Sequence, residues 1–384
     1  MDNKLLFHRP DIAARLASAL LGDDPLNQAG RSGLFLAAPR RTGKSTFLRT
    51  DLIPAIENAG AIAVYVDLWV DKTRNPADLI AEAVRDKLGG KPGGATLAKA
   101  FEGLRAATGK QVVFIIDEAQ HALTTAEGES TLFALKAARD ALNLGSERPG
   151  LAILATGSMR SKISDLVMGK NQAFYGASVA DFPALGKDFI RHLLRSMLLH
   201  RFREKQLPDT DRVMAAFKRL GYRPEELSKA ITDAVTRPEA DISDAVEAAA
   251  QARYDAAVIR LRQQVANLPD IQRAIVRRLA TASIAGGGAP TTVFGKESLH
   301  WYEQDLGGKK VSAAMVQKAL VALVADEVVW RSSHGSYQLD DELMAEVVFA
   351  GGLESRSLVQ RPATAPARGP TRVRAPKLTA RRGP

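Results

Sequence analysis

The stretch Leu34–Thr46 constrains the fold of this chain more than any other segment. Its sequence is LFLAAPRRTGKST: a short apolar run leads into a loop ending in Gly-Lys-Ser, and a helix-compatible pattern follows. In such an arrangement, backbone N–H groups of the loop and of the helix N-terminus point at a phosphate. We therefore expect a phosphate-binding loop in which Lys44 reaches the β- and γ-phosphates of ATP and Ser45 ligates Mg²⁺. The candidate nucleotide-binding residues are Pro39, Arg40, Arg41, Thr42, Gly43, Lys44, Ser45 and Thr46.

Two features of this loop are unusual. Ala38 replaces the first glycine of the motif, which a strand end tolerates, whereas Gly43 stays where the backbone bends around the phosphate. Arg40 and Arg41 lie inside the loop, where they are either solvated or in contact with a phosphate or a neighbouring subunit. The alternative for the whole stretch is an ordinary strand–turn–helix, and the flanking strand and helix favour the phosphate-binding interpretation.

A second apolar run ends in two acidic residues. The run 112–116 is Val-Val-Phe-Ile-Ile, as expected for a central parallel strand covered on both faces, and Asp117 and Glu118 follow it. Open α/β sheets place ligands at the carboxyl ends of their strands, so these carboxylates are expected beside the phosphate loop. We predict that Asp117 holds Mg²⁺ in the Walker-B role and that Glu118 polarises the attacking water. The alternative is a helix N-cap with a favourable first-turn charge.

A further strand, 151–155, ends in Thr156-Gly157-Ser158. A polar residue at this strand end can sense the γ-phosphate or orient the water, and Thr156 and Ser158 both qualify. Apolar runs at 61–66 and 177–182 predict two more strands, with helical patterns between the strands. The fold class is therefore α/β: a parallel-sheet P-loop core over residues 1–186.

The remainder of the chain changes character. Residues 187–267 read as helices only, which fits a helical lid on a nucleotide domain. Residues 268–350 contain three helical patterns and two strands joined by a Gly-containing turn, which predicts a winged helix-turn-helix. Gln317 and Lys318 are expected on the exposed face of its third helix, with Lys309 and Lys310 at its start. Winged helices contact double-stranded DNA or protein partners, and both remain open here.

The basic charge is concentrated at the C-terminus. The net charge is +10, but the last 30 residues contain eight Lys and Arg and no Asp or Glu, which leaves +2 for the rest. Five prolines and few large apolar residues predict that the tail, 351–384, is disordered. A solvated basic tail attracts polyanions, nucleic acid before anionic lipid, and the alternative is a solubility tail without a partner.

Several classes of protein are disfavoured. The sequence has no cysteine, so it has no disulfide framework and no thiolate metal site, and its six histidines lack ligand spacing. No run approaches the roughly 20 apolar residues of a membrane span, and the first residues lack a signal-peptide core. A cytoplasmic location is the default expectation.

Four features together resemble the AAA+/STAND group of P-loop ATPases. They are the phosphate loop 38–45, the strand end 115–120 (Ile-Ile-Asp-Glu-Ala-Gln), the strand end 155–158 (Ala-Thr-Gly-Ser) and the C-terminal module. The chain is most similar to archaeal-type ATPases allied to origin-recognition proteins, and Asp-Glu-Ala-Gln-His also occurs in transposition-helper ATPases. In the archaeal-type ATPases the loop after the sensor strand ends in arginine, where this chain has Ala177. The departure removes the arginine expected there.

The resemblance implies ATP binding, Mg²⁺-dependent hydrolysis, and nucleotide-gated self-association or partner binding. The preferred hypothesis is an ATP-driven switch in which the lid closes on the core and the winged helix and tail engage DNA. The alternative is a STAND-like regulatory ATPase whose winged helix binds a partner protein.

Overall fold

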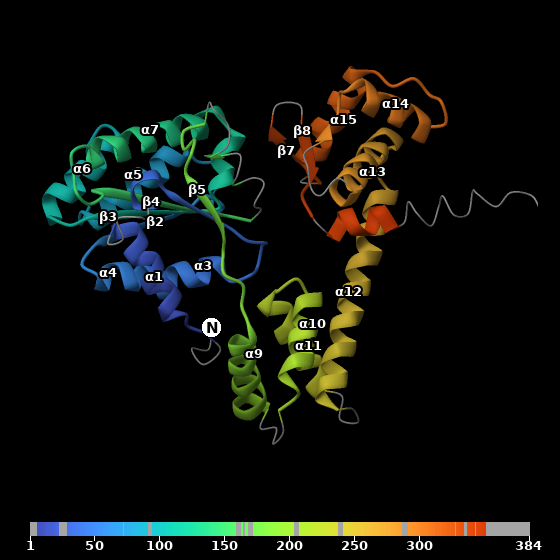
Figure 1. Cartoon of the computed structure of the whole chain (residues 1–384), viewed down its shortest axis with the longest axis horizontal. Coiled ribbons are helices and arrows are strands. Elements are labelled where there is room, and N and C mark those ends of the chain that lie inside the picture. Colours follow the sequence, from blue (N-terminus) through green and yellow to red (C-terminus); the bar gives the residue numbers. More distant parts are fainter. Residues whose placement is uncertain are drawn as a thin grey trace, which may run out of the picture.

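The computed structural model describes residues 6–22, 29–71, 73–90, 94–158, 163, 166–167, 172–202, 207–236, 241–285, 291–326, 328–333, 336–341 and 343–350. Figure 1 shows a lobe built around a parallel sheet, a group of helices below it, and a C-terminal module reached by one long helix. The predicted tail lies outside the described residues. Within those residues, no helix combines the length and hydropathy needed to cross a membrane.

The first lobe is a three-layer α/β core, as the sequence predicts. Its strands are β1 (Leu34–Ala37), β2 (Ile62–Asp67), β3 (Val112–Asp117), β4 (Leu151–Gly157) and β5 (Ser178–Asp181). All neighbouring strands are parallel, and their order across the sheet is β2-β3-β4-β1-β5. The five predicted strands are therefore confirmed to within two residues at each end. The strand order places β4 between the strand that precedes the phosphate loop and the strand that ends in Asp117.

Helices cover both faces of this sheet (Figure 1). One layer contains α5 (Pro76–Lys87), α6 (Leu97–Thr108) and α7 (Ala126–Asn143), and the other contains α1 (Pro10–Leu21), α3 (Lys44–Phe47) and α4 (Ile53–Asn58). Short elements complete the lobe: α2 (Ala29–Ser32), the π-helical turn η2 (Leu48–Leu52) and the 3-10 turn η3 (Ala119–Thr124).

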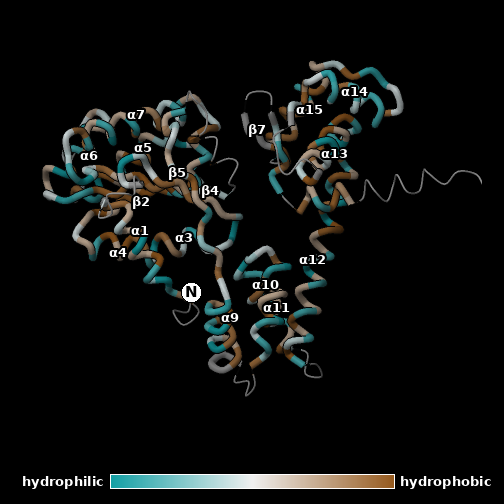
Figure 2. The backbone as a smooth tube through the Cα atoms, viewed as in Figure 1, coloured by the Kyte–Doolittle hydropathy of each residue, from teal (hydrophilic) through white to brown (hydrophobic). Residues whose placement is uncertain are grey.

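The central strand shows why the sheet needs both layers. Val112, Phe114 and Ile116 belong to the hydrophobic core under one helix layer, whereas Val113 and Ile115 belong to the core under the other. Alternate side chains of a strand point to opposite faces, so an uninterrupted apolar run is stable only when both faces are buried. Figure 2 shows the strands as a largely hydrophobic band between helices that contain both hydrophilic and hydrophobic residues.

The N-terminal segment contacts both the α/β core and the helices that follow the core in the sequence. The Arg9 guanidinium lies 4.6 Å from the ring centroids of Phe47 and Phe182 and donates to the Pro183 carbonyl at 2.7 Å. The neighbouring Phe7 ring packs edge-on against Phe189, at 5.8 Å between ring centroids; Phe189 belongs to the helical unit from residue 187 onward, which we call the lid. Residues 7–9 therefore contact both the phosphate-loop side of the core and the lid.

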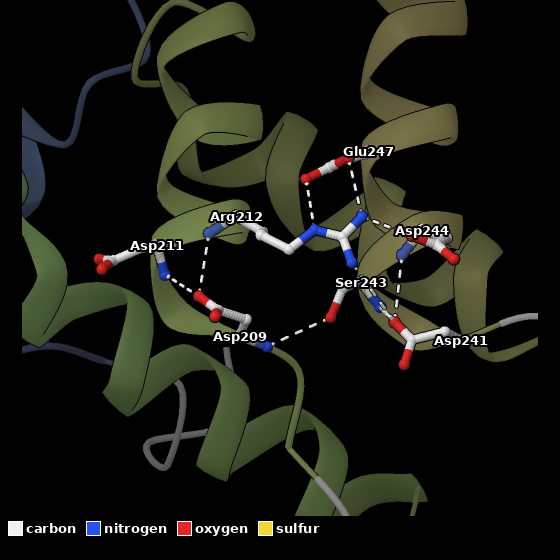
Figure 3. A network of polar contacts seen from close by, with 7 residues as sticks. All are labelled: Asp209, Asp211, Arg212, Asp241, Ser243, Asp244 and Glu247. Carbon is white, nitrogen blue, oxygen red and sulfur yellow. Dashed lines mark hydrogen bonds and ion pairs between the residues drawn. The ribbon is translucent and has the colours of Figure 1, made fainter.

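The second unit consists only of helices, as predicted for residues 187–267. They are α9 (Lys187–Leu194), the π-helical continuation η4 (Arg195–Phe202), α10 (Thr210–Arg219), α11 (Pro224–Val235) and α12 (Ile242–Ala266). Arg212 of α10 donates to both carboxylate oxygens of Glu247 on α12, at 2.9 and 3.0 Å, and also pairs with Asp244 (Figure 3). Asp209 and Asp241 cap the two helices. This network fixes α10 against the N-terminal half of α12.

The C-terminal module has the predicted helices and hairpin. It comprises α13 (Asp270–Ala285), β6 (Thr291–Thr292), α14 (Lys296–Asp305), α15 (Ala313–Ala325), β7 (Val329–Ser333) and β8 (Ser336–Leu339), followed by helical residues 343–350. The strands form an antiparallel sheet of order β6-β8-β7, in which β6 was not predicted. Leu261 and Val265, near the end of α12, belong to the core of this module, whereas Val246 belongs to the lid core. The helix is therefore shared by both units.

Candidate nucleotide-binding site

The phosphate loop joins β1 to α3 and has the backbone that the motif requires. Gly43 precedes α3 in the left-handed conformation, with φ of 87°. Any residue with a Cβ atom would have a strained backbone at this φ, which explains why the position is glycine. The Thr42 hydroxyl donates to the Pro39 carbonyl at 2.8 Å and closes the loop.

Lys44 lies at the centre of the site. Its side chain is only 4% exposed, and its ammonium donates to the carbonyls of Ala38 at 3.0 Å and Pro39 at 3.3 Å. Its Nζ is also 3.5 Å from Oε1 of Glu118. Burial lowers the pKa of Lys44, and the charges of Glu118 and Asp117 partly offset this effect. The lysine of the loop and the acidic strand end, predicted separately, thus meet across β4.

Asp117 is fully buried and held by neighbouring strands on both sides. Tyr65 of β2 donates to Oδ2 of Asp117 at 3.0 Å, and Thr156 of β4 donates to its Oδ1. Burial and the charge of Asp117 raise the pKa of Tyr65, so its hydroxyl remains a donor. The two hydroxyls orient the carboxylate. Thr156, one of the two predicted sensor residues, therefore lies beside Asp117, with its hydroxyl directed at that carboxylate.

Glu118 is held in a strained conformation, with φ of 54°. The Nε2 amide group of Gln120 donates two hydrogen bonds: one to Oε2 of Glu118 at 2.5 Å and one to the Ser158 hydroxyl at 3.1 Å. Ser158 at the end of β4 therefore supports Glu118 through Gln120, just as Thr156 supports Asp117 directly. A Cβ on Gly157 would collide with Gln120, so the small residue between the two hydroxyls makes room for this amide.

The two arginines of the loop have different surroundings. The Arg40 guanidinium lies 4.6 Å from the ring centroid of Trp69, which follows β2, and the Trp69 ring packs edge-on against His121 at 4.5 Å. Arg41 points to the lid, where its Nη1 is 3.7 Å from Oε2 of Glu225 on α11. Thr46 is exposed and Ser45 is half-buried on the first turn of α3.

The donor set fits Mg²⁺, which binds proteins through few carboxylate and hydroxyl oxygens and keeps the rest of its coordination for phosphates and water. The Asp117 carboxylate and the Ser45 hydroxyl are ligands of this kind. Among the described residues, no group of three or more His, Cys, Asp or Glu side chains forms a metal-binding cluster. A Mg²⁺ ion here would therefore depend on the nucleotide for most of its ligands.

Sequence reasoning missed two residues of this site, Tyr65 and Gln120. Tyr65 donates directly to Asp117, and Gln120 donates directly to Glu118. Tyr65 gives little signal in the sequence, whereas Gln120 lies two residues after Glu118 and is a polar residue in a buried segment.

Comparison with known proteins agrees with this geometry. Residues 28–160, which contain the loop, both acidic residues and the end of β4, match the family model described as the AAA domain. Over these residues the chain is similar to the AAA domain. A search of curated proteins found no match.

Solved structures extend the similarity beyond the AAA domain. The ADP form of the ORC2 protein of Aeropyrum pernix shares 15% identity, with a TM-score of 0.56, and the match covers 90% of this chain and 95% of that one. The Walker-type ATPase Paby2304 of Pyrococcus abyssi shares 17% identity, with a TM-score of 0.50, over 89% and 96% of the two chains. The chain thus has a fold like that of the ORC2 and Paby2304 structures over most of its length.

Proposed function

We propose that this protein binds and hydrolyses ATP with Mg²⁺ and uses the cycle as a molecular switch. The observation that carries the proposal is the 3.5 Å approach of the Lys44 ammonium to the Glu118 carboxylate, beside the oriented carboxylate of Asp117. A cation for the phosphates, a metal-binding carboxylate and a base are the parts that phosphoryl transfer to water needs. The ADP-bound and ADPNP–ADP-bound structures of ORC2, which have a similar fold, support the choice of nucleotide.

Each residue has a distinct task in this proposal. Lys44 exchanges its loop carbonyls and Glu118 for the β- and γ-phosphates. Ser45 and Asp117 hold Mg²⁺, which supplies positive charge to the phosphate oxygens when it is bound. Glu118 accepts a proton from the attacking water, and Gln120 and Ser158 hold its carboxylate in place. Thr156 keeps Asp117 oriented.

Removal of the metal tests the enzymatic part of this proposal. We expect ATP-dependent release of phosphate by the wild-type chain in Mg²⁺ and its loss in excess EDTA, with recovery when Mg²⁺ is returned. The physical reason is that the Asp117 carboxylate and the Ser45 hydroxyl carry no positive charge. Without the ion they leave the charge of the phosphates uncompensated. Phosphate release of equal rate in EDTA would rule out the metal role of Asp117 and Ser45.

We propose further that the C-terminal module is a winged helix that engages duplex DNA together with the basic tail. The exposed side chains of Gln317 and Lys318 on α15, and of Lys309 and Lys310 before it, support this proposal. Lysine side chains neutralise phosphates, and a helix with exposed polar residues can enter a major groove.

One observation favours a second function for the module, the binding of a protein partner. The same helix exposes Met315 by 46%, Val321 by 61% and Val324 by 41%. Exposed apolar residues along one helix are more typical of a protein contact than of a phosphate contact. In this case the protein is a STAND-like regulatory ATPase.

A salt titration separates these two functions. If the module and tail neutralise phosphates, the affinity for duplex DNA should fall at least about tenfold between roughly 50 and 200 mM salt. Lys318→Ala should reduce the affinity and the salt dependence, whereas Lys218→Ala, an exposed lysine on lid helix α10, should change neither. No binding at low salt would favour the protein partner.

A further inference from the structure

Backbone strain occurs at three non-glycine residues among those described, and two of them lie in the nucleotide site. Among the described residues, the non-glycine residues with positive φ are Arg41 at 65°, Glu118 at 54° and Tyr222 at 54°. Arg41 belongs to the phosphate loop, Glu118 to the acidic strand end, and Tyr222 to the turn before lid helix α11. Such conformations cost free energy and persist mainly where function requires them. An arginine at a strained loop position, where glycine would be relaxed, suggests that its side chain is needed.

We propose that Arg41 distinguishes ATP from ADP because Glu225 of the lid and the terminal phosphate compete for its guanidinium. This inference rests on the proposed function and assigns a role to two residues within it. Arg41 is two residues before Gly43 in the loop that surrounds the phosphates. Guanidinium groups bind phosphate oxygens through two parallel hydrogen bonds, and ATP offers one more phosphate than ADP.

The Arg41–Glu225 contact is suited to exchange. The two groups are 3.7 Å apart, and their side chains are 66% and 54% exposed. Exposed ion pairs contribute little because water screens them and two long side chains must be ordered. The terminal phosphate of ATP, which carries up to two negative charges, is a stronger partner than one exposed carboxylate.

Glu225 does not lose all its partners when Arg41 leaves. Its other oxygen, Oε1, is 2.7 Å from the ammonium of Lys229, one turn later on α11. The hydrogen bond from Lys229 is the main cause that lowers the pKa of Glu225, and Arg41 contributes least. The exchange therefore transfers one cation from the lid to the nucleotide without leaving an unpaired carboxylate behind. It also removes one ionic contact between the phosphate loop and the lid.

A double-mutant cycle on nucleotide affinity tests this inference. Arg41→Gly keeps a backbone that tolerates positive φ, and it should weaken ATP binding by about tenfold while ADP binding changes less than about twofold. Glu225→Gln should strengthen ATP binding by about two- to fivefold, because the terminal phosphate no longer competes with a carboxylate at position 225 for Arg41. In the Arg41→Gly background, Glu225→Gln should have no further effect on ATP.

The control is Glu226→Gln, which removes the same charge from the adjacent position of α11; Glu226 pairs with Lys229 at 3.1 Å. It should leave the ratio of ATP to ADP affinity unchanged. Equal effects of Arg41→Gly on ATP and ADP, or effects of Glu225→Gln that persist without Arg41, would overturn the inference while the proposed function stands. A wild-type chain that binds neither nucleotide would overturn both.

Discussion

Lys44→Ala is expected to abolish measurable ATP binding. The ammonium is buried, and the loop carbonyls of Ala38 and Pro39, together with Glu118, are its partners. Hydrogen bonds to charged groups contribute about 1.5–3 kcal/mol each, so the loss of two such bonds to phosphates corresponds to an affinity at least about 100-fold lower. Removal of the cation also leaves the Glu118 carboxylate facing the phosphates, which adds repulsion.

Calorimetric titration with ATP would measure this loss, and circular dichroism would confirm that the variant is folded. Lys110→Ala is a suitable control because Lys110 is an exposed lysine of the same domain outside the loop. It should bind ATP like the wild-type chain. A folded Lys44→Ala variant with unchanged affinity would remove this lysine from the site.

Glu118→Gln is expected to bind ATP and to hydrolyse it at least about 100-fold more slowly. The substitution preserves the size of the side chain and removes the base, and general-base catalysis contributes roughly 10²–10⁴-fold. Affinity should change by less than about threefold, because Lys44 retains its loop partners. Turnover at saturating ATP, measured as phosphate release, tests the expectation.

The matched control is Glu127→Gln, an exposed acid in the first turn of α7, close to η3. Its turnover should equal that of the wild-type chain. Undiminished turnover in Glu118→Gln would assign the base to another group and leave Glu118 as a structural partner of Lys44 and Gln120.

The elements of the core could be predicted from the sequence because their signals are local. The run 112–116 is apolar at every position, and only a strand buried on both faces suits it. The phosphate loop 38–45 could likewise be predicted, because its characteristic residues are adjacent in the sequence. Asp117, Glu118, Thr156 and Ser158 were identified as strand-end residues, and all four lie at the carboxyl edge of the sheet.

The partners of these residues could not be predicted, because they depend on the order of strands in the sheet. Tyr65 reaches Asp117 because β2 lies beside β3, and Ser158 reaches Gln120 because β4 lies on the other side. The pairing of Arg41 with Glu225 joins residues 184 positions apart and depends on how the lid is placed against the core. No periodicity or spacing contains that information.

The extent of the C-terminal units also depends on packing. The sequence places a boundary after residue 267, where α12 ends. In the structure, the last turns of α12 already pack in the core of the C-terminal module. One continuous helix therefore belongs to the cores of both units, with no loop between them.

The most direct test of the central claim is a calorimetric titration of the wild-type chain with ATP in the presence of Mg²⁺, with Lys44→Ala in parallel. The account predicts saturable binding with one site per chain, abolished in the variant and weakened when EDTA removes the metal. Absence of binding to a folded wild-type chain, or equal binding to both proteins, would contradict it.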